Sequence, residues 1–158
     1  MANARKYLYL FLISMVPIAE LRAAIPFGHI NSLSPVLTYL FAVIGNFLPV
    51  PFILLFIRRV LLFMKRVKYL DKIALFLEKK AEKNRGKVER YATFGLLLFV
   101  AVPLPGTGAW TGALVAALMN MRMKNALLSI LGGILIAGCI MTLVSWGALS
   151  FLSFLIPA

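Results

Sequence analysis

The chain has 158 residues, and 62% of them are hydrophobic. A composition this apolar, arranged in long runs, excludes an ordinary soluble domain and predicts an integral membrane protein. The formal net charge is +12, and ten of the 17 Lys and Arg residues fall between positions 65 and 90. Because such a juxtamembrane basic segment faces anionic lipid, we exclude nucleic acid as a partner and expect membrane lipids instead.

The first apolar segment covers residues 7–25 and contains Glu20 and Arg22. Pro17 and Pro26 are predicted to break it, since proline lacks the N–H group that a helix needs. The start of the segment imitates a signal peptide. We expect no cleavage, because Glu20 and Arg22 are poor neighbours for a cleavage site.

A longer helix is predicted after a short loop. Ser34 and Pro35 form a good N-cap and first-turn pair. From there to about Ile57 the helix is long enough to cross a hydrocarbon core of about 30 Å. Asn46 and the prolines at positions 49 and 51 are predicted to interrupt it.

Residues 58–90 are predicted to be a cytoplasmic connection, because the positive-inside rule assigns a segment this rich in Lys and Arg to the cytoplasm. Apolar side chains recur in it at three- and four-residue steps, which indicates an amphipathic helix on the membrane surface. These side chains are Val67, Leu70, Ile73, Ala74, Leu77 and Ala81. A solvated basic linker is the alternative.

The second apolar segment, residues 94–121, is interrupted at its centre by Pro103, Pro105, Gly106 and Gly108. A plain spanning helix has no use for these residues at mid-depth. Non-helical backbone survives there only where protein buries it or where it lines a watery cavity. The segment is therefore predicted to be a broken helix, which is a typical place for a transporter's binding site.

The two halves of the chain show the same order of features. Residues 16–26 align with residues 102–112, and each stretch follows an apolar run and precedes a longer apolar segment, the last one covering residues 126–155. We therefore predict a single membrane domain over the whole chain. Its two repeats would be residues 7–57 and 94–156, joined by the basic connection.

Two all-α topologies are compatible with this pattern. Either all four apolar segments span the membrane, or the two broken segments are re-entrant hairpins and only two segments cross. The half-segments reach only about 13 to 17 Å each, which favours hairpins. A hairpin followed by one crossing would make the two repeats inverted.

Two stretches resemble a known family. Residues 20–28, with the sequence ELRAAIPFG, and residues 103–114, with the sequence PLPGTGAWTGAL, are similar to the small multidrug export protein family of prokaryotes. The resemblance covers nearly the whole chain and implies transport across the prokaryotic plasma (inner) membrane. More distantly, the layout resembles the DedA superfamily, which implies paired re-entrant hairpins and translocation of polyprenyl phosphate lipids. The DedA pattern has an acid in the first hairpin, which Glu20 matches, and arginines in the second, where residues 103–114 are uncharged.

Glu20 is the only acid in any apolar segment. A carboxylate at bilayer depth is costly unless it is paired or protonated, so Glu20 is predicted to couple protons or to pair with substrate. A structural ion pair with Arg22 is the alternative, although residues two apart do not face each other on a regular helix. The further residues predicted to bind substrate are Arg22, Asn46, Gly106, Thr107, Gly108, Trp110 and Thr111.

The sequence contains no nucleophile–base constellation, phosphate loop or metal cluster, so we expect no enzyme, no cofactor and no bound metal. The leading prediction is a transporter, acting as a homodimer, that moves an amphipathic or lipid-phosphate anion. N–H groups at the start of the second half-helix would favour such an anion. A proton-coupled exporter of hydrophobic cations and a membrane scaffold without transport are the alternatives.

Overall fold

The structure is a computed structural model that describes residues 2–64, 85–104 and 106–155. Within these ranges all regular structure is α-helical, so the predicted all-α class is confirmed. The helices are α1 (Ala2–Met15), α2 (Glu20–Ile30), α3 (Pro35–Phe47), α4 (Val50–Met64), α6 (Arg85–Ala101), α7 (Ala109–Leu118) and α8 (Met123–Leu155). The amphipathic helix predicted for residues 67–81 lies outside the described residues.

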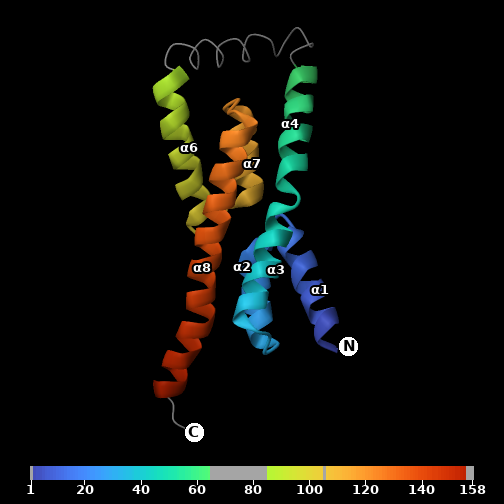
Figure 1. Ribbon diagram of the computed structural model, residues 1–158, viewed down its shortest axis with the longest axis vertical. Helices are drawn as coiled ribbons and strands as arrows, with labels where there is room; N and C mark the ends of the chain where they lie inside the picture. Colours follow the sequence, from blue (N-terminus) through green and yellow to red (C-terminus); the bar gives the residue numbers. More distant parts are fainter. Residues whose placement is uncertain (1, 65–84, 105, 156–158) are drawn as a thin grey trace.

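The helices form two short pairs and two long crossings (Figure 1). The first pair, α1 and α2, starts at the lower end of the molecule and turns back at mid-height, so its connection lies near the centre. Helices α3 and α4 then run from the lower to the upper end. The second pair, α6 and α7, starts at the upper end and also turns back at mid-height, and α8 returns along the whole length.

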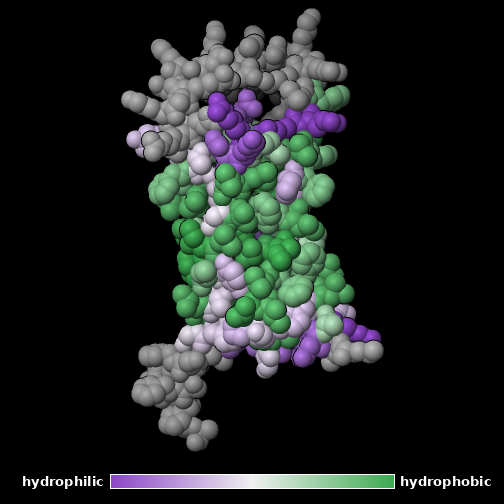
Figure 2. Space-filling view, viewed as in Figure 1, coloured by the Kyte–Doolittle hydropathy of each residue, from purple (hydrophilic) through white to green (hydrophobic). Residues whose placement is uncertain are grey.

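Among the residues that the structure describes, two stretches are long and apolar enough to cross a membrane. They are Pro35–Val60, with 26 residues from α3 and α4, and Met123–Gly147, with 25 residues of α8. At 1.5 Å per residue, either one exceeds a hydrocarbon core of about 30 Å. Figure 2 shows the matching surface, a hydrophobic band around the middle with hydrophilic side chains gathered toward both ends. The fold is that of a membrane protein with transmembrane helices.

The turn between α3 and α4 follows from two prolines. Pro49 and Pro51 have no N–H, so the carbonyls four residues earlier lose their helical partners. The helix is interrupted there, as predicted for the two prolines, with Leu48 and Pro49 forming the turn. Asn46 does not interrupt it, because it lies inside α3. The predicted start is also right, because Ser34 is extended (φ −60°, ψ 130°) and Pro35 opens α3, although the Ser34 side chain makes no capping hydrogen bond.

Pro26 is not a helix break, and that prediction was wrong. It lies inside α2, which continues to Ile30. An interior proline costs about 3 kcal/mol, but most helical stability in proteins comes from tertiary packing. The residues around Pro26 provide that packing, since Leu21, Ala24 and Ile25 are each at most 2% exposed.

Helices α2 and α7 end in the same way. Ser32 and Asn120, each two residues past its helix, have positive φ angles of 55° and 51°. In both loops a pair of backbone hydrogen bonds closes the end in the Schellman arrangement. The bonds run from Ser32 N–H to the His29 carbonyl (2.9 Å), Leu33 N–H to Gly28 (2.9 Å), Asn120 N–H to Ala117 (3.0 Å) and Met121 N–H to Ala116 (3.0 Å). Corresponding loop residues are 88 positions apart.

Each long crossing packs closely on the first helix of the pair before it. A Cβ atom on Gly45 would overlap the Ser14 side chain and would lie 2.7 Å from the Phe11 carbonyl oxygen. A Cβ atom on Gly133 would likewise meet Val100 and would lie 2.9 Å from the carbonyl oxygen of Leu97. The two glycines are 88 positions apart, whereas their partners are 86 positions apart, so two extra residues fall in the second connection.

Candidate functional site

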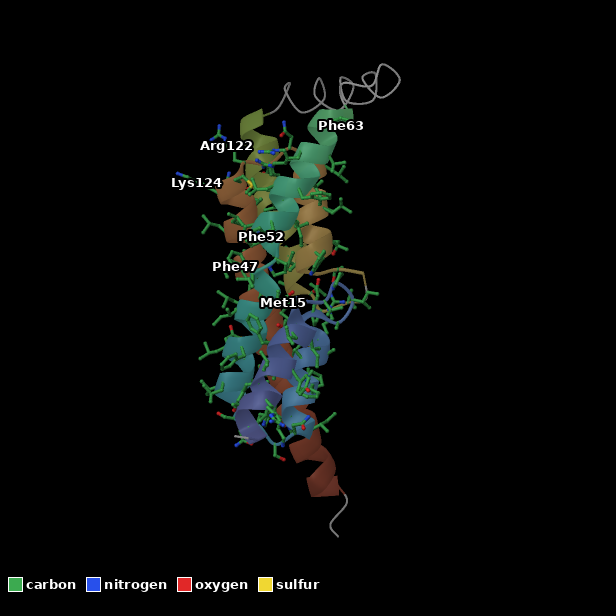
Figure 3. All side chains as sticks on the ribbon, turned by 90° about the vertical axis from the view of Figure 1, so that its right-hand side faces the viewer. Met15, Phe47, Phe52, Phe63, Arg122 and Lys124 are labelled. Carbon is green, nitrogen blue, oxygen red and sulfur yellow. The ribbon has the colours of Figure 1, made fainter. Side chains whose placement is uncertain are left out.

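The connections of the two helix pairs meet at mid-height. We call them the first tip (residues 16–19) and the second tip (residues 102–108). Figure 3 places Met15, which precedes the first tip, near the middle of the molecule, with Arg122 and Lys124 toward the upper end. The indole Nε1–H of Trp110, just after the second tip, donates to the Met15 carbonyl over 3.1 Å. That carbonyl is available because α1 ends there, so an aromatic side chain of one pair caps a helix of the other.

Glu20 directly follows the first tip, and its side chain reaches the second tip and the start of α7. Its side chain is 5% exposed, and its carboxylate Oε1 accepts the backbone N–H of Trp110 over 3.2 Å. The backbone of Ala109 and the side chain of Asn46 also interact with it. A carboxylate at the first N–H groups of α7 satisfies donors that a helix leaves free and complements the helix dipole.

The backbone around Glu20 is unusual. Glu20 has φ 48°, in the left-handed region that non-glycine residues rarely adopt. Gly108 has φ 146°, and a Cβ atom there would overlap the Glu20 carboxylate. Strained residues persist where the surrounding structure holds them, and they concentrate at functional sites. The two tips therefore form one tightly fitted unit around this carboxylate.

Arg22 has a different partner from Glu20. Its Nη2 donates to the Thr107 hydroxyl over 3.0 Å, so the charged groups at positions 20 and 22 reach different parts of the second tip. The Thr107 hydroxyl lies 2.7 Å from the Val102 carbonyl and 2.9 Å from the Leu104 carbonyl, to which it can donate. The Thr107 hydroxyl thus stabilises the backbone of the second tip and also binds Arg22. Gly106 turns the chain with φ 87°.

A cavity of about 1120 Å³ opens beside the two tips. Its charged lining comes from Glu20 and Arg22, and one wall is an apolar face of α4. Phe52 and Phe56 in that wall are each 69% exposed, so they offer apolar surface to whatever enters. The lining residues are Pro17, Ile18, Glu20, Arg22, Phe52, Ile53, Phe56, Ile57, Pro103, Gly106, Thr107, Trp110, Thr111, Leu114 and Met141.

The structure brings most of the predicted binding residues together. Those that line the cavity are Glu20, Arg22, Gly106, Thr107, Trp110 and Thr111. Gly108 lies beneath the Glu20 carboxylate. Asn46 is 1% exposed and reaches Glu20 rather than the cavity, and its Oδ1 has no hydrogen-bond partner. Pro17 and Pro103 lie in the tips, whereas Pro105 is outside the described residues.

The wall from α4 was not predicted as part of the site. Phe52 and Phe56 are four residues apart on an apolar helix, and in the sequence this spacing is the same as that of any lipid-facing stripe. Arg58, two residues after Phe56 on α4, donates from Nη2 to the Met121 carbonyl in the loop after α7. Among the described residues no group of three His, Cys, Asp or Glu side chains could hold a metal ion.

In the part of the chain that the structure describes, the fold is all-helical and has two apolar stretches of membrane-crossing length, with the buried Glu20 and the half-buried Arg22 at mid-height. These features define a polytopic membrane protein. Residues 20–140 match the family described as "Putative small multi-drug export protein", and the chain belongs to this family. The family resemblance of residues 20–28 and 103–114 is thereby confirmed, and the family name suggests a small multidrug export transporter. No curated protein and no solved structure matches the chain. The relationship to the DedA superfamily stays a prediction.

Proposed function

We propose that the protein is a small membrane transporter that moves an amphipathic or lipid-phosphate anion through the site between the two tips. The observation that supports this function best is the cavity itself, in which a guanidinium and a buried carboxylate meet a large apolar wall at mid-height. Charged groups at bilayer depth are costly and mark substrate or ion pathways in membrane proteins. The DedA-like lipid substrate of the sequence prediction is one member of this substrate class.

We propose further that both helix pairs are re-entrant and that the two repeats have inverted topology. Tyr91–Ala101 and Ala109–Leu118 are short apolar helices, and about 10 residues reach only about 15 Å. The pairs start from opposite ends of the molecule (Figure 1). In this arrangement residues 58–90 and Arg122 share the cytoplasmic side of a prokaryotic plasma membrane, as the positive-inside rule favours. We propose a homodimer, because one protomer of this size offers little room to enclose a pathway and a second protomer would enlarge it.

The anion would bind at Arg22. The N–H groups at the start of α7 already hold the Glu20 carboxylate. Arg22 instead has a neutral hydroxyl partner in Thr107, which an anionic oxygen can replace with a stronger, charge-assisted bond. The apolar part of the substrate would lie along Phe52, Phe56 and Leu114, where the exposed side chains form a wall open toward lipid.

Glu20 would couple this step to protons. A protonated carboxyl group is a weaker acceptor than a carboxylate, so protonation would loosen the bonds from Glu20 to the start of α7. The two tips would then separate around the substrate, since the Glu20 bond is one of the contacts that join them. Such a two-state element, biased by one ligand, is what alternating access requires.

A hydrophobic cation is the second candidate substrate, and the family name favours it. In that case Glu20 itself would pair with the cation and would release a proton in exchange. A scaffold without transport is the third reading, and it requires only that the fold be intact.

Transport in proteoliposomes separates these readings. Wild type, Glu20→Gln and Arg22→Ala would be compared with a fluorescent polyprenyl-phosphate analogue, a lipophilic dye cation and an internal pH indicator. Leaflet exchange of the phosphate lipid that is lost in Arg22→Ala supports the leading proposal. Dye movement with proton counterflow that is lost in Glu20→Gln supports the cation exporter. Absence of all three signals from folded protein would leave the scaffold.

A further inference from the structure

Buried polar side chains follow one another through the first half of the molecule. Asn46 Oδ1, Thr38 Oγ1 and His29 Nδ1 are buried atoms without a hydrogen-bond partner in the described protein. Ser14 is 0% exposed. Together with Glu20 these residues form what we call the polar path. Glu20 and Ser14 have partners, since the Ser14 hydroxyl donates to the Phe11 carbonyl over 2.7 Å. Buried polar groups cost free energy unless they are hydrogen-bonded, so the three unpartnered atoms call for an explanation.

The upper part of the polar path ends at the candidate site. The Asn46 side chain interacts with Glu20, and its Oδ1 is an open acceptor. The Ser14 hydroxyl packs directly on Gly45, the neighbour of Asn46 in the chain. The Ser14 hydroxyl itself donates to the Phe11 carbonyl over 2.7 Å, so Asn46 Oδ1 is the open polar atom next to the carboxylate.

The lower part continues toward the end of the molecule where α2 meets α3. Thr38 and Asn46 are eight residues apart, so they lie on the same face of α3 about 12 Å from each other. The residue between them on this face is the small Ala42, which is 0% exposed. Thr38 packs on Gly28 of α2. The neighbouring His29, in the last turn of α2, packs its ring edge-on against Trp146 of α8, with 4.7 Å between the ring centroids.

The second half has apolar residues at the corresponding positions. Residues of the two halves correspond at a distance of 86 positions before the tip and 88 positions after it. The counterparts are Val100 for Ser14, Gly108 for Glu20, Ala117 for His29, Ala126 for Thr38 and Ile134 for Asn46. Ala42 corresponds to the larger Ile130. Because the second half packs with apolar side chains, the polar ones of the first half are not needed for the fold.

We infer that the polar path holds a chain of water molecules that carries protons to Glu20 from the lower end of the molecule. Buried polar atoms that lack a protein partner bind ordered water, and each such water needs 2–4 polar partners. A proton from water at the lower surface would pass along this chain and form the O–H bond on the Glu20 carboxylate. Thr38 and Asn46 keep their own protons and hold the water. This inference rests on the proton role of Glu20 in the proposed function.

The charges around Glu20 allow this role. Arg22 is the charged residue that interacts with Glu20 among the described residues. Helix α7 contains no ionisable side chain. The Tyr39 hydroxyl of α3 donates to the Leu135 carbonyl of α8 and so points to another helix. Glu20 is therefore the acidic group at which the polar path ends, with Arg22 beside it.

The test follows Glu20 directly and needs no substrate. Infrared spectroscopy of reconstituted protein would record the carboxyl C=O band that is absent from Glu20→Gln, and a pH jump would give its rate of protonation. Thr38→Val keeps the shape of the side chain but removes the hydroxyl. We expect it to slow protonation by about tenfold, the effect of one lost hydrogen bond of ordinary net strength. Thr38→Ser should retain the wild-type rate.

A matched control lies in the second half. Ser129 is a buried residue whose hydroxyl donates to the Thr93 carbonyl over 2.8 Å, and Ser129→Ala should leave the protonation rate unchanged. Thr38→Ala, which copies Ala126, and Asn46→Leu provide further variants if Thr38→Val does not fold. Equal rates in wild type and in the variants at positions 38 and 46 would overturn the inference. So would a carboxyl band that does not respond to pH.

The two proposals fail in different ways. If Glu20→Gln transports substrate as well as wild type does, the proposed coupling is wrong, but slower protonation in Thr38→Val would still establish the path. If Glu20→Gln abolishes transport while Thr38→Val protonates at the wild-type rate, the coupling stands and the path is overturned.

Discussion

The carboxylate of Glu20 occupies the space that a side chain at position 108 would need. Glu20 opens α2 with φ 48°, and Gly108 immediately precedes α7 with φ 146°. Glu20, the residue after the first tip, thus supplies a side chain. Gly108 of the second tip, which has no side chain, leaves the space that accepts it. Because the carboxylate also binds the N–H of Trp110, this fit fixes how the two helix pairs meet.

Gly108→Ala is expected to destabilise the protein and to abolish transport. The added methyl group would displace the Glu20 carboxylate, and alanine is strained at this φ. Strain of about 1–3 kcal/mol, with the loss of the Trp110 bond, should lower the thermal unfolding midpoint measured in detergent.

Gly106 provides the control for this substitution. It also has a positive φ, 87°, but a Cβ atom there would meet nothing within 4 Å. Gly106→Ala should therefore show the strain without the overlap and lose less stability than Gly108→Ala. Adding Glu20→Ala to Gly108→Ala should recover part of the stability and none of the transport. Equal losses at positions 106 and 108 would contradict the fit described here.

Thr107→Val is expected to separate Arg22 from the second tip. The valine keeps the shape but cannot bond to Arg22 or to the Val102 carbonyl. Loss of a hydrogen bond to a charged group costs about 1.5–3 kcal/mol, reduced here because Arg22 is only half-buried. Thr107→Ser retains the hydroxyl and should remain close to wild type in both thermal stability and transport. A valine variant as stable and active as the serine variant would remove Thr107 from the site.

The tips were predictable from the sequence because prolines and glycines at bilayer depth have few other uses. The chain breaks at Pro17 and at Pro103, and polar residues from both breaks meet. The register between the halves was less predictable. The sequence alignment paired Glu20 with Gly106, whereas the closing turns and the packed glycines pair it with Gly108. The two extra residues lie in the irregular connection between α6 and α7. An irregular connection has no repeating pattern of apolar residues from which an insertion could be recognised.

The role of α4 could not be read from its residues, because a lipid-facing stripe and a cavity wall have the same composition. Phe52 and Phe56 become part of the site only when α7 is placed beside α4.

At Pro26 the sequence predicted a feature that the structure does not have. A local rule predicted a break, but burial of the neighbouring Ala24 and Ile25 keeps the helix intact.

Gly45→Ala and Gly133→Ala are expected to destabilise the protein by similar amounts. In each case the new methyl group would overlap a side chain and approach a backbone carbonyl of the adjacent helix. Overpacking of this kind costs about 1–3 kcal/mol. Gly95→Ala is the control, since its Cβ atom would meet nothing within 4 Å, and alanine in a helix should stabilise by about 0.5–1 kcal/mol. Tolerance of alanine at position 45 or 133, judged by thermal unfolding, would refute this packing.

Arg58→Met is expected to loosen the upper end of the cavity. Arg58 donates to the Met121 carbonyl in the loop that ends α7, where a positive charge also complements the helix dipole. Methionine keeps an apolar stem of similar length but loses both effects, which should lower stability by about 1–2 kcal/mol.

The neighbouring Arg59 is exposed and offers the matched substitution Arg59→Met, which should change stability by less than about 0.5 kcal/mol. Because α4 carries Phe52 and Phe56, a looser α4 should also alter the cavity. In a Trp146→Phe background, where Trp110 is the remaining tryptophan, quenching of its fluorescence by a lipid-soluble quencher measures this, and it should rise in Arg58→Met and not in Arg59→Met. Equal quenching in the two variants would show that α4 is held against α7 by its apolar contacts and not by Arg58.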